Sequence, residues 1–147
     1  MFLDRRELCL LLPSALLGAA VPLEAAAPQD ASLPSATFTF DSLPMHTLNG
    51  AEIRSVLKGK LATGEPLETH ETTLPPGVAP HPPHRHPHSE MWLIREGTVE
   101  VTINGKSHIL GPGSVGFVQS NEEHGIRNAG AVRASYFVVG VGPGADK

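Results

Sequence analysis

The sequence predicts an all-β domain, and three observations support this prediction. Apolar and polar residues alternate in short segments along most of the chain, as in strands with one buried face. Glycine and proline are frequent, at 15 and 14 of 147 residues, and they divide these segments by turns. No segment after the N-terminal region has a helical period. Many short strands joined by turns indicate a sandwich or a small barrel.

The strands can be placed one after another along the chain. The first is expected at residues 37–40, where polar and apolar residues alternate. Asn104 and Gly105 give the strongest hairpin signal, because both residues tolerate positive φ. The other strands are expected at residues 52–61, 67–74, 91–95, 98–103, 106–110, 115–118, 124–128 and 132–141.

Length and composition restrict the class of protein. A chain of 147 residues suggests one domain, and 40% hydrophobic residues with 18% charged residues indicate a globular chain. The net charge of -4 and the lack of a basic stripe exclude a nucleic-acid-binding surface. Cys9 is the only cysteine, which excludes an intrachain disulfide and cysteine-based metal or redox motifs.

Residues 1–27 are typical of an export signal. Arg5 and Arg6 precede an apolar run at residues 8–20, which is too short to span a membrane, and small residues follow. The paired arginines resemble a twin-arginine signal. We expect cleavage, a polar linker at residues 28–36, a domain at residues 37–147, a periplasmic or secreted location and no stable membrane insertion. The alternative is a short N-terminal helix packed on the domain.

A histidine-rich segment at residues 77–97 contains candidate metal ligands. His84 and His86 are two residues apart, so on an extended strand both side chains point to the same face. Prolines at 82, 83 and 87 impose turns, after which Glu90 opens a β-like run. Two imidazoles and a carboxylate brought together in this way make a first shell for a divalent metal. The alternative is an exposed histidine–proline tract or linker.

A second segment delivers a further histidine in the same context. His124 follows a turn and begins a strand. Together the two segments resemble the motifs of the cupin superfamily, in particular the small single-domain cupins of the type-2 conserved-barrel kind. The first motif matches His84, His86, Glu90 and Gly97, although its leading glycine lies one residue further away, at Gly77.

The second cupin motif matches Gly113, His124 and Asn128. Gln119 replaces its proline and Asn121 its glycine, and asparagine tolerates the left-handed conformation that this turn needs. The resemblance extends over about residues 50–141, and two spaced motifs are more specific than either alone.

The resemblance implies a double-stranded β-helix, or jelly-roll, barrel with a metal inside. The ligands carried over are His84, His86, Glu90 and His124. Three neutral imidazoles and one carboxylate suit Mn(II), Fe(II), Ni(II) or Zn(II). The resemblance also suggests a homodimer.

The other histidines are not expected to be ligands. His81 and His88 are predicted to be exposed or at the mouth of the barrel. The remaining histidines are interpreted as ordinary strand or turn residues: His46, His70 and His108. Trp92 shares the strand parity of Glu90 and is expected to face inward, while Phe117 and Tyr136 could line the pocket or the core.

Three functions remain open from the sequence. The first is an exported cupin that binds a divalent metal and has an unassigned reaction. The second is a metal-dependent dioxygenase or decarboxylase acting on a small organic substrate. The third is a non-catalytic module that binds a small sugar or carboxylate. An enzyme should place an added acid or base beside the metal, and the sequence shows no clear candidate.

Overall fold

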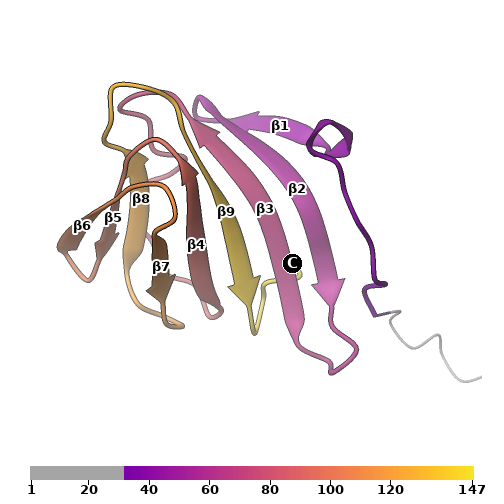
Figure 1. Cartoon of the computed structure of the whole chain (residues 1–147). Coiled ribbons are helices and arrows are strands. Elements are labelled where there is room, and N and C mark those ends of the chain that lie inside the picture. The colour runs from indigo at the N-terminus through magenta and orange to yellow at the C-terminus, as the bar shows by residue number, and fades with distance from the viewer. Residues whose placement is uncertain (1–31) are drawn as a thin grey trace, which may run out of the picture.

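The computed structural model describes residues 32–147 (Figure 1). The predicted export signal at residues 1–27 lies outside the described residues. Within residues 32–147 there are nine strands and one 3-10 helix, η1 (Phe40–Ser42). The strands are β1 (Met45–Leu48), β2 (Ala51–Lys60), β3 (Pro66–Leu74), β4 (Ser89–Glu96), β5 (Val99–Ile103), β6 (Lys106–Leu110), β7 (Val115–Val118), β8 (His124–Asn128) and β9 (Ala134–Val141).

The strands form two antiparallel sheets. The larger has the order β1-β2-β3-β9-β4-β7, and the smaller has the order β6-β5-β8. Figure 1 shows β2, β3 and β9 as a curved layer, with β5, β6 and β8 grouped to one side of it. The chain crosses repeatedly between the sheets, since β4 and β7 pair in the larger sheet while β5 and β6 pair in the smaller one.

The core fills the space between the two sheets. Trp92, Tyr136 and Leu74 from the larger sheet are its largest fully buried apolar side chains, and they belong to one cluster with Val99 and Ile126 from the smaller sheet. The inward position predicted for Trp92 is therefore confirmed. Of the two ambiguous aromatic residues, Tyr136 is buried, whereas Phe117 is 53% exposed on the outer face of β7.

The N-terminal part of the domain differs from the prediction. The strand expected at residues 37–40 is wrong, because this segment has no strand partner and Phe40 begins η1. The guanidinium groups of Arg54 and Arg95 instead lie over the Phe40 ring, at 4.5 and 5.3 Å from its centroid. Sequence reasoning also missed β1, whose four residues are all exposed and so show no burial pattern.

Residues in the predicted linker already contact the barrel. The Leu33 N–H donates to the Lys60 carbonyl at 2.7 Å, and the Leu33 side chain lies over Gly59. The domain boundary at residue 37 stays a prediction. Within residues 32–147 no helix has the length and hydropathy needed to cross a membrane.

The predicted hairpin turn at Asn104 and Gly105 is confirmed. Both residues have positive φ, 48° and 76°, and the flanking residues Ile103 and Lys106 pair directly. Asn121, which stands where the second motif usually has glycine, also has positive φ, at 64°. Asparagine therefore adopts the left-handed conformation that this turn requires.

Gly97, the last residue of the first motif, is expected to be intolerant of any side chain. Its φ is +74°, and an added Cβ would lie 2.5 Å from the Arg133 carbonyl oxygen and 2.6 Å from the Ala134 Cα. Gly97→Ala should therefore lower the free energy of unfolding by about 2–5 kcal/mol, through left-handed strain and a backbone clash. Urea unfolding tests this. Gly105→Ala is the matched control, because Gly105 has a similar φ of +76° and an added Cβ there has nothing within 4 Å. Its free energy of unfolding should fall less, by the cost of the left-handed conformation alone.

Candidate metal centre

Two backbone hydrogen bonds join the two histidine-bearing segments. His84 and His124 form an isolated antiparallel bridge, with N–H to carbonyl distances of 2.9 Å and 3.0 Å. Gly125 permits this close approach, since a Cβ there would lie 3.2 Å from the Pro83 ring. The extended segment before β4 is thus held along the start of β8.

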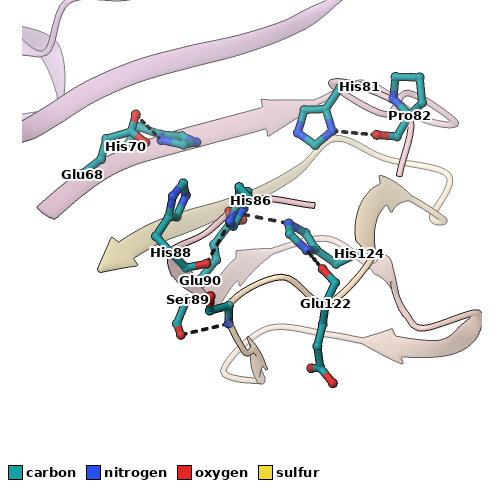
Figure 2. A network of polar contacts seen from close by, with 11 residues as sticks. Glu68, His70, His81, Pro82, His86, His88, Ser89, Glu90, Glu122 and His124 are labelled. Carbon is teal, nitrogen blue, oxygen red and sulfur yellow. Dashed lines mark hydrogen bonds and ion pairs between the residues drawn. The ribbon is translucent and has the colours of Figure 1, made fainter. Parts of the chain in front are cut away.

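The turn before His124 is attached to the same segment. The Asn121 N–H donates to the His86 carbonyl at 2.8 Å, and the Ser120 hydroxyl donates to the Pro87 carbonyl at 2.6 Å. The Ser120 N–H donates to the Ser89 hydroxyl at 3.2 Å (Figure 2). These contacts fix the position of His86 relative to His124.

Three of the predicted ligands, His84, His86 and His124, form one cluster, and Glu90 adjoins it through His86 and His124. His84, His86 and His124 each offer a nitrogen within 4.8 Å of the others. The Glu90 Oε2 atom lies 2.9 Å from His86 Nε2 and 3.9 Å from His124 Nε2. Figure 2 shows His86, Glu90 and His124 turned toward one another. The residues that the motifs single out are brought together by β4, β8 and the extended segment before β4.

Backbone carbonyls orient two of the imidazoles. His124 Nδ1 donates to the Glu122 carbonyl and His86 Nδ1 donates to the His88 carbonyl, each at 2.9 Å. Each bond directs the opposite nitrogen, Nε2, toward the centre of the cluster, as in metal sites whose second shell fixes the histidine tautomer.

Two imidazole nitrogens in the cluster are buried without a partner. Within residues 32–147, His124 Nε2 and His84 Nδ1 have no hydrogen-bond partner. Leaving a buried polar atom unpaired costs about 1–3 kcal/mol. A divalent cation would satisfy such lone pairs, so the donor set and its environment fit a metal ion.

His86 and Glu90 form a charged pair in the absence of a metal. The hydrogen bond to the Glu90 carboxylate raises the pKa of His86 above its ordinary value. Burial would raise the pKa of Glu90, but the hydrogen bond from His86 and the neighbouring histidines lower it instead. Since His86 Nδ1 already donates to a carbonyl, the proton between the two side chains is on His86 Nε2, which would be the ligand atom.

The pKa of His84 is shifted in the opposite direction from that of His86. Burial, followed by the charges of His81, His124 and His86, lowers the pKa of His84 to about 4. Its imidazole is therefore neutral at physiological pH, which is the form that binds metals.

His88 is closer to the cluster than predicted. Its ring stacks on His86, with centroids 3.6 Å apart and an angle of 8°, and its buried Nδ1 has no partner among the described residues. Together with His86 and Glu90 it forms a second group that could hold a metal. Gly140 provides the space, since a Cβ there would be 3.2 Å from His88 Cδ2. The prediction that His88 is exposed or at the mouth is therefore corrected.

His81 lies at the edge of the cluster. Its ring centroid is 4.2 Å from that of His84, and its Nδ1 donates to the Pro82 carbonyl at 3.1 Å. Its side chain is partly exposed, so it lies at the rim rather than in the centre.

A cavity of about 180 Å³ opens beside Glu90 inside the barrel. Most of its wall is apolar, and His70 and Thr72 of β3 add polar groups to it. It is lined by Leu48, Ile53, His70, Thr72, Pro80, His81, Glu90, Trp92, Ile126, Tyr136 and Val138. His70 is a strand residue, as interpreted from the sequence, and it also lines this cavity. Strand parity could have placed it inside, because His70 is four residues from the fully buried Leu74.

A carboxylate on the same strand holds the His70 ring. His70 Nδ1 donates to Glu68 Oε1 at 3.2 Å (Figure 2). The hydrogen bond from His70 lowers the pKa of Glu68, against the effect of burial. Glu68 is therefore ionised at neutral pH and accepts the Nδ1 proton.

Comparison with known proteins agrees with the motifs and the fold. Residues 70–140 match the family model described as the cupin domain. The matched residues contain all four candidate ligands as well as His70 and His88.

The L-ectoine synthase of Bordetella parapertussis is 38% identical over 56 residues, which cover 37% of this chain and 43% of that protein. The match thus spans less than half the length of that relative.

Two solved structures share the fold of this chain. One is a predicted oxalate decarboxylase from Thermotoga maritima, with a TM-score of 0.62 and 22% identity over 74% of this chain and 100% of that one. The other is an RmlC-like cupin from Shewanella frigidimarina, with a TM-score of 0.62 and 20% identity over 76% of this chain and 96% of that one. The predicted all-β, double-stranded β-helix (jelly-roll) fold is confirmed.

Proposed function

We propose that this protein is an exported cupin that binds one divalent transition metal through His84, His86, Glu90 and His124. The observation that carries the proposal is the convergence of unpaired imidazole nitrogens beside a carboxylate. The donor set suits Mn(II), Fe(II), Ni(II) or Zn(II). Elemental analysis of protein purified from its native compartment tests it: about one ion per chain is expected, and metal-free protein that binds none of the four ions would contradict it.

In this proposal the chain's own residues prepare the site for its ligand. The Glu122 and His88 carbonyls orient His124 and His86, while Trp92, Ile126 and Val138 give the adjoining cavity apolar walls. A bound metal would act as a Lewis acid toward an oxygen of the ligand.

A proton on His86 should compete with the metal. Because the pKa of His86 is raised, the ring is still protonated at weakly acidic pH, and metal binding must displace that proton. We expect the apparent metal affinity to fall as pH drops through about 6.5 and below, with release of about one proton per ion bound in that range. Calorimetry in two buffers of different ionisation enthalpy measures both quantities. An affinity that is constant between about pH 5 and 8 would contradict the expectation.

The export part of the proposal is supported by residues 1–27 and is tested separately. The charged start, the short apolar run and the small residues predict that the first ~20–27 residues are absent from the mature protein. N-terminal sequencing of protein from the source cell measures this, and a mature chain beginning at Met1 would contradict it. The homodimer remains an expectation from the resemblance.

A second candidate is an enzyme, specifically a metal-dependent dioxygenase or decarboxylase acting on a small organic substrate. The cavity next to Glu90 favours it, because a site of about 180 Å³ takes a small molecule. The similarity to L-ectoine synthase and to the fold of a predicted oxalate decarboxylase supports a small substrate. Metal-dependent turnover of small carboxylates and catechols would separate this candidate from a non-catalytic module that binds a small sugar or carboxylate.

A further inference from the structure

His70 and Glu90 line the same cavity and come from β3 and β4, which lie on either side of β9. On the two sides of β9, Gly140 pairs with Glu68 and Glu90, and Val138 pairs with His70 and Trp92. Strands two positions apart in a sheet are about 10 Å apart. Both His70 and Glu90 line the cavity, which leaves room for a small molecule between them.

The Glu68 carboxylate determines which nitrogen of His70 faces the ligand. It accepts the Nδ1 proton at 3.2 Å, so the neutral ring carries its lone pair on Nε2. This bond to Glu68 is the one hydrogen bond of the His70 ring among residues 32–147. His70 Nε2 is therefore an acceptor without a partner on the protein, in a cavity whose nearby walls are largely apolar.

The size and polarity of the cavity restrict what it can hold. A cavity of about 150 Å³ takes a molecule the size of benzene, so the 180 Å³ found here fits roughly six or seven heavy atoms. One end, at Glu90, adjoins the candidate metal ligands and suits an anionic group when a cation is bound there. The other end, at His70, suits a hydrogen-bond donor. The stretch between them is lined by Trp92 and Val138, which suits a short carbon chain.

We propose that His70, held by Glu68, binds the hydroxyl group of a small hydroxy carboxylate whose carboxylate lies at the metal centre. This inference rests on the proposed metal-binding function and adds the ligand class. The ligand hydroxyl donates to His70 Nε2. An analogue without the hydroxyl leaves that nitrogen unpaired, which is how a site discriminates against a ligand that lacks one polar group.

The test uses 3-hydroxypropionate and propionate, two acids that differ by that hydroxyl alone. Trp92 is the only tryptophan of the chain and lines the cavity, so its fluorescence reports binding of either acid to the zinc-loaded full chain. We expect the wild-type protein to prefer 3-hydroxypropionate about 3- to 10-fold, the equivalent of one hydrogen bond. His70→Leu should reduce the preference to about one, and His70→Gln, which keeps an acceptor near the position of Nε2, should restore part of it.

Nitrogen-15 NMR of the histidine side chains gives a second readout that does not depend on the variants. In the wild-type protein His70 should be in the Nδ1–H form, and its Nε2 resonance should shift with 3-hydroxypropionate and not with propionate. Glu68→Gln should redistribute the proton between the two nitrogens and weaken the preference between the acids.

The outcomes separate this inference from the function on which it rests. Zinc affinity, measured on the same samples, should be unchanged in His70→Leu. If the wild-type chain binds zinc but neither acid, or if His70→Leu keeps the preference, the inference is overturned while the metal site stands. If the wild-type chain binds none of the four candidate metals, the proposed function is overturned and the inference with it.

Discussion

Replacing His86 with alanine is expected to weaken divalent metal binding by at least about 100-fold. Loss of a residue that only orients a ligand typically costs 10–100-fold in affinity, and loss of the ligand itself should cost more. His86 is the most connected of the four candidates: its Nε2 lies 2.9 Å from Glu90 Oε2, and its nitrogen lies within 4.8 Å of those of His84 and His124. Metal titration followed by calorimetry measures the loss.

His88→Ala is the matched control, because it removes a neighbouring imidazole of the same segment. We expect its metal affinity to stay close to that of the wild-type protein. The His88 carbonyl that accepts the His86 Nδ1 proton belongs to the backbone and remains in the variant, while the stacked ring is lost. If His88→Ala lost the metal and His86→Ala kept it, the site would have to be rebuilt around His88 and Glu90, part of the second group of ligands.

Replacing Asn128 with alanine is expected to lower the free energy of unfolding by about 3–6 kcal/mol, since each unpaired buried group costs about 1–3 kcal/mol. Asn128 is fully buried, and its amide makes three hydrogen bonds. Nδ2 donates to the Leu74 and Val132 carbonyls at 2.9 and 2.8 Å, and Oδ1 accepts from the Gly130 N–H at 2.8 Å. Alanine satisfies none of these partners. Urea unfolding measures the change.

Asn121→Gly serves as the comparison within the same motif. Asn121 is exposed, and its backbone N–H, which donates to the His86 carbonyl, is present in either residue. Glycine adopts the φ of 64° without strain but has more freedom when unfolded, so we expect a change within about 1 kcal/mol. An Asn128→Ala variant as stable as Asn121→Gly would show that the stability of the domain does not depend on these three bonds.

The strands that alternate or end in a clear turn could be predicted from the sequence. The hairpin at Asn104 and Gly105 is an example, because positive φ is a local property of these two residues. The segment at residues 37–40 alternates equally well, yet it has no partner strand, and pairing depends on distant residues. Strand β1 is the opposite case, a strand that was not predicted. It pairs with β2 although all four of its residues are exposed.

The residues of the candidate site also fall into those that local sequence predicts and those whose position depends on distant residues. The two-residue spacing of His84 and His86, and the position of His124 after a turn, are local features that the resemblance to the cupin motifs joined into one ligand set, and the fold brings these residues together. His70 was missed because its importance depends on β9 placing it across from Glu90. His88 was misplaced because the space for its ring comes from Gly140, 52 residues further along the chain.

The backbone bridge between His84 and His124 has a consequence for ion selectivity. Two main-chain hydrogen bonds, which belong to the fold and need no ion, fix the separation of the backbone at these two ligands. The conformational entropy of assembling the ligands is then lost in folding and not in binding, which favours tight binding of an ion that fits the preset spacing. Binding of an ion with another radius would require either longer hydrogen bonds in the bridge between His84 and His124 or the loss of one imidazole ligand. Discrimination among ions of equal charge would accordingly come from the fixed backbone separation of His84 and His124, and the flexibility of side chains would contribute little to it.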